Sequence, residues 1–249
     1  MTLHSAKTWH WVGKRLALAV LGLAFCASAR GAIYTYDSGT INAAIPDNSI
    51  IGLTSSQTVS VLTDPIDSIS VTLIISGGDN GDLYGYLRLN NSPLVVLVNQ
   101  AGVTSSDPDG YANTGFLVTL TSDLSAQDLH FYQNYSPTYN SYGQLTGTWQ
   151  ADGRTSPLDT SRSSLSAFDG LSPNGTWTLF FADRAAGGQS TLVSWSLDIT
   201  PVPERVNVAL ACFGGLFILI KLIHLRFRAP RHANACGVGA SHSAIHPIS

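Results

Sequence analysis

Residues 168–199 read FDGLSPNGTWTLFFADRAAGGQSTLVSWSLDI, and this stretch decides the fold class of the 249-residue chain. A Pro-Asn-Gly turn at 173–175 leads into a segment that carries Trp177, and a Gly-rich loop at 185–190 separates it from a segment that carries Trp195. In both segments large apolar residues recur at every second position, which is the spacing of a β-strand with one buried face. The stretch therefore predicts a β-hairpin whose two tryptophans contribute strongly to a hydrophobic core.

The rest of the middle of the chain shows the same spacing. Short apolar alternations occupy 71–75, 83–89, 94–98, 116–120, 129–132, 177–181 and 192–199. Gly, Asn, Asp and Pro separate them, and no helical period is present between Ile33 and Ile199. This pattern predicts one all-β body over residues 33–200, folded as an antiparallel jelly roll or β-sandwich.

The amino-terminal end has the order of a secretory signal. Three basic residues precede the apolar run 16–25, and small residues follow it in Ala27-Ser28-Ala29. This order predicts a signal peptide with a signal helix over residues 1–29, in which Ala27 and Ala29 direct cleavage. An uncleaved amino-terminal membrane anchor is the alternative.

A second apolar run covers 206–225, and three arginines follow its inner edge. The purely apolar part, 208–220, is shorter than the ~20 residues that a helix needs to cross a bilayer. The longer run spans if Lys221 extends its ammonium toward the interface, with the arginines on the cytoplasmic side. We therefore expect one transmembrane helix within 201–231 and a disordered tail over 232–249, with a buried core helix as the alternative.

The charges of the body exclude one class of partner. From Arg30 to Pro201 the chain has fifteen Asp, five Arg and neither Lys nor Glu, so this segment carries ten net negative charges. Nucleic acid needs a basic surface, so it is not an expected partner. The three cysteines, Cys26, Cys212 and Cys236, all lie outside the body, which therefore has no disulfide framework.

Loop carboxylates make calcium the metal that this composition permits. Asp79 and Asp82 flank Asn80-Gly81, and a second cluster lies at 107–110. Calcium binds carboxylate and carbonyl oxygens, but neither cluster completes an EF-hand loop. Ordinary turn chemistry explains the same residues, because a short Asp side chain bonds to nearby backbone N–H groups.

Catalytic residues are scarce in the body. His130 is its only histidine, and alternation over 129–132 places it on the strand face opposite Leu129 and Phe131. No Gly-x-Ser-x-Gly elbow is present, and a serine hydrolase needs a serine, a histidine and a carboxylate together. We expect His130 to be structural or solvent-facing and the chain not to be an enzyme.

Tyrosines gather in one polar segment, 131–142, which reads FYQNYSPTYNSY. Tyrosine rings on a loop can stack on sugar rings, which would suit a protein of a polysaccharide matrix. The other interpretation is a surface loop that covers one end of the sandwich.

The stretch 168–199 also resembles the end of the P domain, or Homo B domain, of the proprotein convertases and their bacterial relatives. The family pattern is a Phe-x-Gly opening, an Asn-Gly-Thr-Trp-x-Leu strand, an Asp in the next loop and a Gly-x-Leu-x-x-Trp-x-Leu finish. It is met by Phe168, Gly170, Asn174, Gly175, Thr176, Trp177, Leu179, Asp183, Leu192, Trp195 and Leu197. Residues 44–48 and 69–87 are compatible with the family's first half.

This resemblance implies an eight-stranded jelly roll. In the convertases that domain packs against a subtilisin-like protease and stabilises it without cutting peptides. The resemblance also adds Asp183 to Asp79 and Asp82 as a candidate calcium ligand.

Before the second apolar run stand Val202, Pro203 and Glu204. This motif, the apolar run and the basic cluster together resemble the PEP-CTERM sorting signal, which implies an exosortase-like processing enzyme as a partner. The chain departs from the pattern at Arg205, where a second proline is usual, and in residues 229–249, which continue beyond the usual end of such signals.

Three functions remain open on the sequence. The first is a non-catalytic exported protein of the cell envelope or extracellular matrix, anchored by the second apolar run or released after processing, with a P-domain-like interaction or scaffolding module. Its partners would be the membrane and extracellular polysaccharide. The alternative is an accessory domain that stabilises a separately encoded subtilisin-like serine endopeptidase. The third is a hydrolase that uses His130.

Overall fold

The computed structural model describes residues 31–92, 94–203 and 205–227. The predicted signal peptide with Ala27 and Ala29, the sorting residue Glu204 and the predicted tail over 232–249 lie outside the described residues, so they stay predictions. The β-rich body and the carboxyl-terminal helix belong to two separate compact units and are described one at a time.

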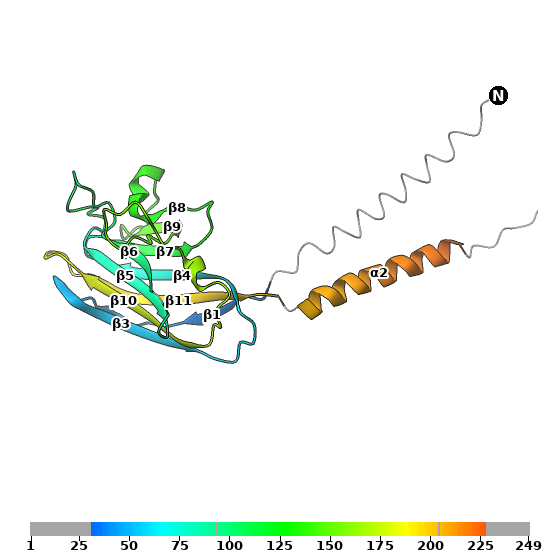
Figure 1. Ribbon diagram of the computed structural model, residues 1–249. Coiled ribbons are helices and arrows are strands. Elements are labelled where there is room, and N and C mark those ends of the chain that lie inside the picture. The colour runs from blue at the N-terminus through cyan, green and yellow to red at the C-terminus, as the bar shows by residue number, and fades with distance from the viewer. Residues whose placement is uncertain (1–30, 93, 204, 228–249) are drawn as a thin grey trace, which may run out of the picture. The chain divides into compact units, whose positions relative to one another are not determined.

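The described part of the body forms two β-sheets (Figure 1). The seven-stranded sheet has the order β1-β11-β4-β7-β9-β8, with the short strand β2 also paired to β11. Its strands are β1 (Tyr34–Asp37), β2 (Ala43–Ala44), β4 (Ile66–Ser76), β7 (Gly115–Thr121), β8 (Gln127–Asp128), β9 (Leu145–Gln150) and β11 (Thr191–Pro201). The four-stranded sheet, in the order β3-β10-β5-β6, consists of β3 (Ser49–Val59), β10 (Gly175–Asp183), β5 (Leu83–Leu89) and β6 (Val95–Asn99).

The core lies between the two sheets because each strand turns its apolar positions inward. In β4 the burial alternates residue by residue from Ile69 to Ser76, and β5 shows the same alternation over its whole length. Trp177 and Trp195 are fully buried or nearly so, and both indole N–H groups donate hydrogen bonds, to the Pro173 carbonyl at 2.9 Å and to the Ser55 hydroxyl at 2.9 Å. The all-β, sandwich-like fold and the inward tryptophans are confirmed.

The predicted hairpin is wrong. Strand β10 pairs with β3 and β5 in the four-stranded sheet, while β11 pairs with β1, β2 and β4 in the other sheet. The loop between them therefore crosses from one sheet to the other. A hairpin would place Trp177 and Trp195 on the same face of one sheet, whereas the crossing lets each sheet supply one tryptophan to the shared core.

Two further expectations need correction. The sheet is not wholly antiparallel, because β9 runs parallel to β7 and to β8. Parallel neighbours need a long connection, and the segment between β8 and β9 supplies one. The second correction concerns residues 129–132, where the sequence predicts a strand. The structure has a 3₁₀ helix there, η1 (Leu129–Tyr135). The Asp128 carboxylate caps this helix by accepting from the His130 N–H at 3.0 Å. A second 3₁₀ helix, η2, covers Leu165–Phe168.

The described residues after the body form a helix, α2 (Arg205–Phe227). Among the residues that the structure describes, none of the helices is both long enough and apolar enough to cross a membrane. The helix is thus present over the predicted run, but its predicted membrane crossing is not confirmed.

Candidate functional site

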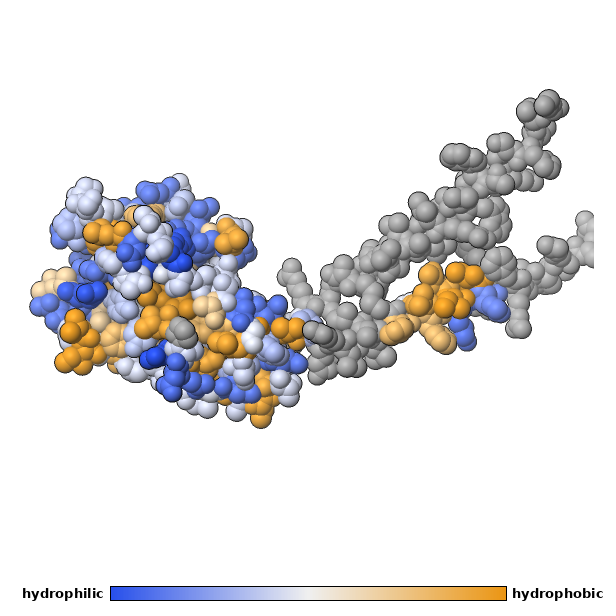
Figure 2. Space-filling view, viewed as in Figure 1, coloured by the Kyte–Doolittle hydropathy of each residue, from blue (hydrophilic) through white to orange (hydrophobic). Residues whose placement is uncertain are grey.

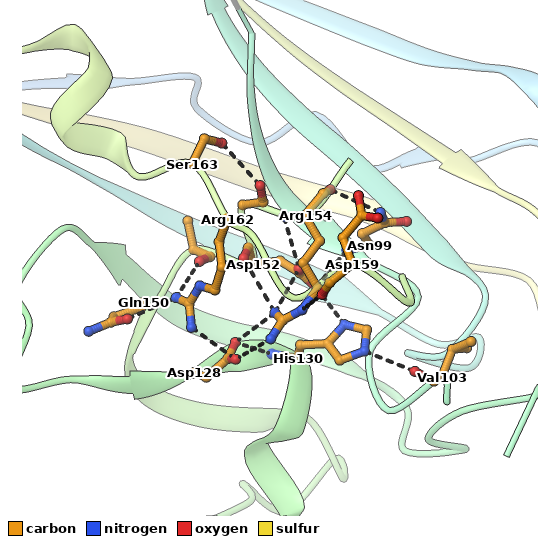
Figure 3. Close-up of polar contacts among 12 residues, drawn as sticks. Asn99, Val103, Asp128, His130, Gln150, Asp152, Arg154, Asp159, Arg162 and Ser163 are labelled. Atoms are coloured by element: carbon orange, nitrogen blue, oxygen red, sulfur yellow. Dashed lines mark hydrogen bonds and ion pairs between the residues drawn. The ribbon is translucent and has the colours of Figure 1, made fainter. Parts of the chain in front are cut away.

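Three groups of side chains in the body are candidates for a functional role. The first is a buried network of charges around η1 and the loop that follows β9. Figure 3 shows its side chains converging from separate segments. The members that form its ion pairs are Asp128, His130, Asp152, Arg154 and Arg162.

Each charge in this buried network has an opposite charge beside it. Arg154 bridges Asp128, at 2.6 Å from Nη2, and Asp152, at 3.1 Å from Nη1. Arg162 also contacts Asp128, at 2.9 Å. Burial raises the pKa of Asp128, but the hydrogen bond and charge of Arg154, aided by Arg162, outweigh it and hold that pKa below its usual value. The two arginines therefore balance the two aspartates, and their pairing stabilises the ionised form of Asp128.

His130 is locked inside the network. Its side chain is fully buried, Nδ1 contacts Asp152 Oδ2 at 2.8 Å, and Nε2 contacts the Val103 carbonyl at 3.0 Å. Both ring nitrogens thus have an oxygen partner inside the body. The structure corrects the predicted strand position of His130 and rules out the solvent-facing interpretation, while the structural one agrees with these contacts.

A cavity of about 520 Å³ lies beside the network. Arg154 and Phe131 line it, with the guanidinium 5.1 Å from the centre of the phenyl ring, but His130 does not line it. The guanidinium is already occupied by Asp128, Asp152 and the Asp159 carbonyl. Asp159 lines the cavity too, and its carboxylate accepts from the Ser156 N–H at 2.7 Å, so both charged groups of the lining already have partners in the chain.

The second group lies where the chain crosses between the sheets. We call this place the crossover junction and define it as residues 77–82, the loop between β4 and β5, together with residues 183–190, the last residue of β10 and the loop that leads to β11. The Arg184 N–H donates to the Asp82 carbonyl at 2.8 Å. Gly78 has a φ of +65° and is so close to Ser190 that a side chain at this position would overlap its hydroxyl. The loops thus hold the two sheets together at this end.

The crossover junction gathers negative charge. The pKa of Asp183 rises to about 6, first because of burial and then because of Asp82 and Asp47. Burial also raises the pKa of Asp82, and the carboxylates of Asp79, Asp109 and Asp47 add to the rise. The structure therefore brings the predicted ligands Asp79, Asp82 and Asp183 into one neighbourhood and adds Asp47 and Asp109 to it.

These carboxylates do not form a finished metal cage. Within the described ranges, no three His, Cys, Asp or Glu side chains lie close enough together to hold a metal ion by themselves. Calcium binding by Asp79, Asp82 and Asp183 stays a prediction.

The third group is on the outside of the four-stranded sheet. Tyr86 of β5 stands opposite Phe180 of β10, and their rings stack at 4.9 Å with an interplanar angle of 19°. Tyr84 meets Phe180 edge-on at 6.5 Å, and the Arg184 guanidinium lies 5.7 Å from the Tyr84 ring centre. Together with Ile50, which is 80% exposed, these residues form what we call the aromatic face. A hollow of about 230 Å³, lined by Ile50, Tyr84, Phe180, Ala182 and Arg184, opens on it.

The aromatic face departs from the general character of the surface. Figure 2 shows apolar residues as separate patches within a largely polar surface on the side in view. An outward strand position usually carries a polar residue, and Thr178 follows that rule next to Phe180. Three half-buried aromatic side chains at neighbouring outward positions therefore indicate a contact surface.

The remaining predicted residues lie apart from these groups. Tyr135 and Tyr139 are about two-fifths exposed and Tyr142 is 82% exposed, whereas Tyr132 is buried and donates to Asn113. The segment 131–142 is therefore only partly available to a ligand. Val202 and Pro203 follow β11 directly, and the Val202 N–H donates to the Pro65 carbonyl at 2.8 Å.

Sequence reasoning missed two of the three groups. The network was missed because Asp128, Asp152 and Arg154 are brought together by a loop that no alternation predicts. The aromatic face carried a signal, since Tyr84 and Tyr86 occupy the outward positions of a predicted strand. That signal was not recognised because Phe180 and Phe181 are adjacent and both apolar, so the sequence does not show which of them faces the core and which faces outward.

Searches with the sequence find neither a matching family model nor a matching curated protein. Among solved structures, the chain is similar to the serine protease of Aeromonas sobria, with a TM-score of 0.39 and 16% identity over 73% of this chain. It is also similar to a complex of that protease with its chaperone, with a TM-score of 0.38 and 17% identity. In both, this chain corresponds to 29% of the length of the matched chain. Neither likeness assigns a function to this chain.

Proposed function

We propose that this chain is a non-catalytic, exported interaction module that docks through its aromatic face onto a subtilisin-like serine endopeptidase encoded separately. The observation that carries the proposal is the set of packed, half-buried rings on the outside of the four-stranded sheet. Tyr and Phe are enriched at the cores of protein interfaces because they bury a large area at a small entropy cost. The P-domain resemblance supplies the identity of the partner, because in the convertases that domain packs on such a protease.

The non-catalytic part of the proposal is supported by the surroundings of His130. A general base needs a ring nitrogen within reach of the substrate. Here one nitrogen contacts Asp152 and the other the Val103 carbonyl, and the side chain is fully buried. A hydrolytic role for His130 would require the network to open.

The test uses the full chain with an affinity tag and an envelope extract labelled with a fluorophosphonate, which marks active serine hydrolases. We expect the wild-type chain to retain a labelled subtilisin-like protease and to lengthen the half-life of its activity at elevated temperature. Replacing both stacked rings, Tyr86→Ser with Phe180→Ser, should abolish both effects. Tyr142→Ser is the matched control, since it removes an exposed ring elsewhere. Retention of no serine hydrolase, or equal retention by the double variant, would refute the proposal.

The cellular part of the proposal concerns export and sorting. We propose that residues 1–29 direct export and that Val202, Pro203 and Glu204 serve recognition by an exosortase-like enzyme, leaving the body outside the inner membrane, either anchored or released. The mass of the mature chain in the membrane and extracellular fractions tests both ends. A mature chain that still contains residues 1–29, or an unchanged fraction after Glu204→Ala, would contradict this route.

A second candidate is binding of extracellular polysaccharide by the tyrosine segment. The specific observation is the exposure of Tyr142, with partial exposure of Tyr135 and Tyr139. A glycan array with the same tagged chain separates the two candidates. Sugar binding that is lost in Tyr142→Ser and kept in the Tyr86→Ser, Phe180→Ser double variant would favour the matrix function.

A further inference from the structure

Two buried side-chain oxygen atoms at the crossover junction lack a hydrogen-bond partner of good geometry. Asp183 is fully buried, and its Oδ1 accepts only a long bond of 3.4 Å from the Ala185 N–H, while Oδ2 accepts none. The Ser190 hydroxyl oxygen is buried and unpartnered as well. Across the described residues just two other buried side-chain atoms are in this state, Gln57 Nε2 and Asn99 Oδ1. Since buried polar atoms are almost always paired, two orphan oxygens in one place call for an explanation.

The two orphan oxygens belong to the same neighbourhood. A weak hydrogen bond from the Ser190 hydroxyl toward Asp183 lowers the pKa of that carboxyl, but its geometry is too poor to satisfy either buried oxygen. Ser190 also lies against Gly78 of the opposite loop, where only a glycine leaves room for its hydroxyl. Both loops of the crossover junction thus enclose these oxygens, and a partner between them would tie one loop to the other.

The charges at the crossover junction point to a cation as that partner. Asp82 and Asp47 act on Asp183, and Asp79 and Asp109 act on Asp82, all in the direction of mutual repulsion. The neighbouring charges that perturb these two groups are all carboxylates. A cation would offset the repulsion and give both orphan oxygens the partner they lack.

The available donors select the kind of cation. Carboxylate and hydroxyl side chains and loop carbonyls all offer oxygen ligands, and within the described ranges no three acidic, histidine or cysteine side chains lie close enough together to hold a metal ion by themselves. Zinc prefers nitrogen and sulfur ligands, and magnesium needs a near-octahedral shell and loses its waters reluctantly. Calcium takes about six to eight oxygens in a flexible shell that includes main-chain oxygens and water.

We propose that the crossover junction binds one calcium ion through the Asp183 carboxylate, the Ser190 hydroxyl and the Asp82 carboxylate, with Asp47 at the outer edge. The ion joins the loop after β4 to the loop after β10 and so fixes the two sheets relative to each other at this end. This site differs from the sequence prediction, because Ser190 replaces Asp79 among the direct ligands.

The test is thermal unfolding of the full chain after EGTA treatment and dialysis, with CaCl₂ or MgCl₂ added back, together with calorimetric titration of CaCl₂. Calcium at about a hundred times its Kd lowers the unfolding equilibrium constant about 100-fold, which corresponds to a rise in Tm of roughly 5 to 10 °C for a body of this size. Magnesium at the same concentration should have a much smaller effect.

Two variants and one control make the result specific. Asp183→Asn keeps the shape and removes the charge, so it should abolish the calcium response, and Ser190→Ala should weaken calcium binding about tenfold while the body stays folded. Asp67→Asn is the matched control, because this exposed aspartate lies near the start of β4, at the other end of the strand that leads into the junction. A wild-type chain whose Tm does not respond to calcium would overturn the proposal. So would a response that persists unchanged in both Asp183→Asn and Ser190→Ala, since the ion would then be bound elsewhere.

Discussion

The buried charge network and the crossover junction each contain a fully buried aspartate, but the two aspartates have opposite surroundings. Asp152 in the network contacts His130 at 2.8 Å and Arg154 at 3.1 Å. Asp183 at the crossover junction has one oxygen without any donor, and its charged neighbours are other carboxylates. Burial is thus the same in both places, and only the partners differ.

This difference separates an aspartate whose partners belong to the chain from one for which we propose a partner from solution. In the network, Arg154 and Arg162 lower the pKa of Asp128, and the two aspartates in turn raise the pKa of Arg154. Each charge there is stabilised by another part of the same chain. At the crossover junction the charged neighbours of Asp183 are carboxylates, and the chain offers it only the Ala185 N–H and the Ser190 hydroxyl, so a bound ion is the partner that we propose. We therefore expect the network to contribute stability under all neutral conditions, and the junction to do so only when the proposed ion is bound.

The largest effect should come from removing the central cation of the network. Arg154→Met leaves Asp128 and Asp152 with one fewer counter-charge in a site that is almost fully buried, which should lower the free energy of unfolding by about 3 to 5 kcal/mol. Urea denaturation measures it. Arg162→Met is the control, and because its side chain is 25% exposed and pairs with one carboxylate, about 1 kcal/mol is expected. Equal losses of unfolding free energy in the two variants would mean that Arg154 is no more important to the network than Arg162.

The comparison itself can be tested by making the same substitution in both places. Asp152→Asn removes the carboxylate that contacts His130 and pairs with Arg154, so it should destabilise the body by about 2 to 3 kcal/mol. Asp183→Asn in the absence of calcium removes a charge that has no partner, so it should stabilise the body by roughly 1 kcal/mol. Urea denaturation in EGTA gives both values. If both substitutions change the free energy of unfolding in the same direction, the proposed difference between the two regions is wrong.

The sandwich could be predicted because its signal is local. Period-two alternation gave 83–89 with the bounds of β5, and 116–120 and 177–181 fall inside β7 and β10. Strand β3 was missed because SIIGLTSSQTV is an edge strand, most of whose residues are at least partly exposed, so that it lacks a clean apolar face. The hairpin was wrong because alternation tells which residues face the core and is silent on which sheet a strand joins.

The candidate sites could be predicted only in part, since they depend on contacts between distant segments. Asp79 and Asp82 were recognised from one loop, but Asp47 and Ser190 reach the crossover junction through the pairing of the sheets. The position of His130 was misjudged because the Asp128 cap starts a 3₁₀ helix at the point where the apolar spacing indicates a strand. The free energy of one capping hydrogen bond, about 1 kcal/mol, is similar to the whole strand preference of these four residues, so the cap can decide the local structure.

An acid titration tests whether the ion pairs of Asp128 stabilise the network. The pKa of Asp128 is lowered in the folded body, so its ion pairs contribute fully above the unfolded pKa of about 4 and are lost as the pH falls through the lower folded value. The wild-type chain should therefore exceed Asp128→Asn in unfolding free energy by about 2 kcal/mol at neutral pH. The gap should close as the pH falls toward 2. Urea denaturation at a series of pH values measures it, and a gap that stays constant throughout would show that Asp128 acts through packing.

The smallest expected effect is the most direct test of whether Ser190 lacks a hydrogen-bond partner at the crossover junction when no ion is bound. Ser190→Ala removes a hydroxyl that has no hydrogen-bond partner, so without calcium the free energy of unfolding should change by less than about 0.5 kcal/mol. Thr72→Val is a matched control, because its hydroxyl is paired with Thr119 at 3.0 Å and its loss should cost about 1 kcal/mol. A larger loss in Ser190→Ala than in Thr72→Val would mean that the junction satisfies Ser190 by itself. In that case its two loops would be held together without an ion, and the difference between the two regions would be one of charge alone.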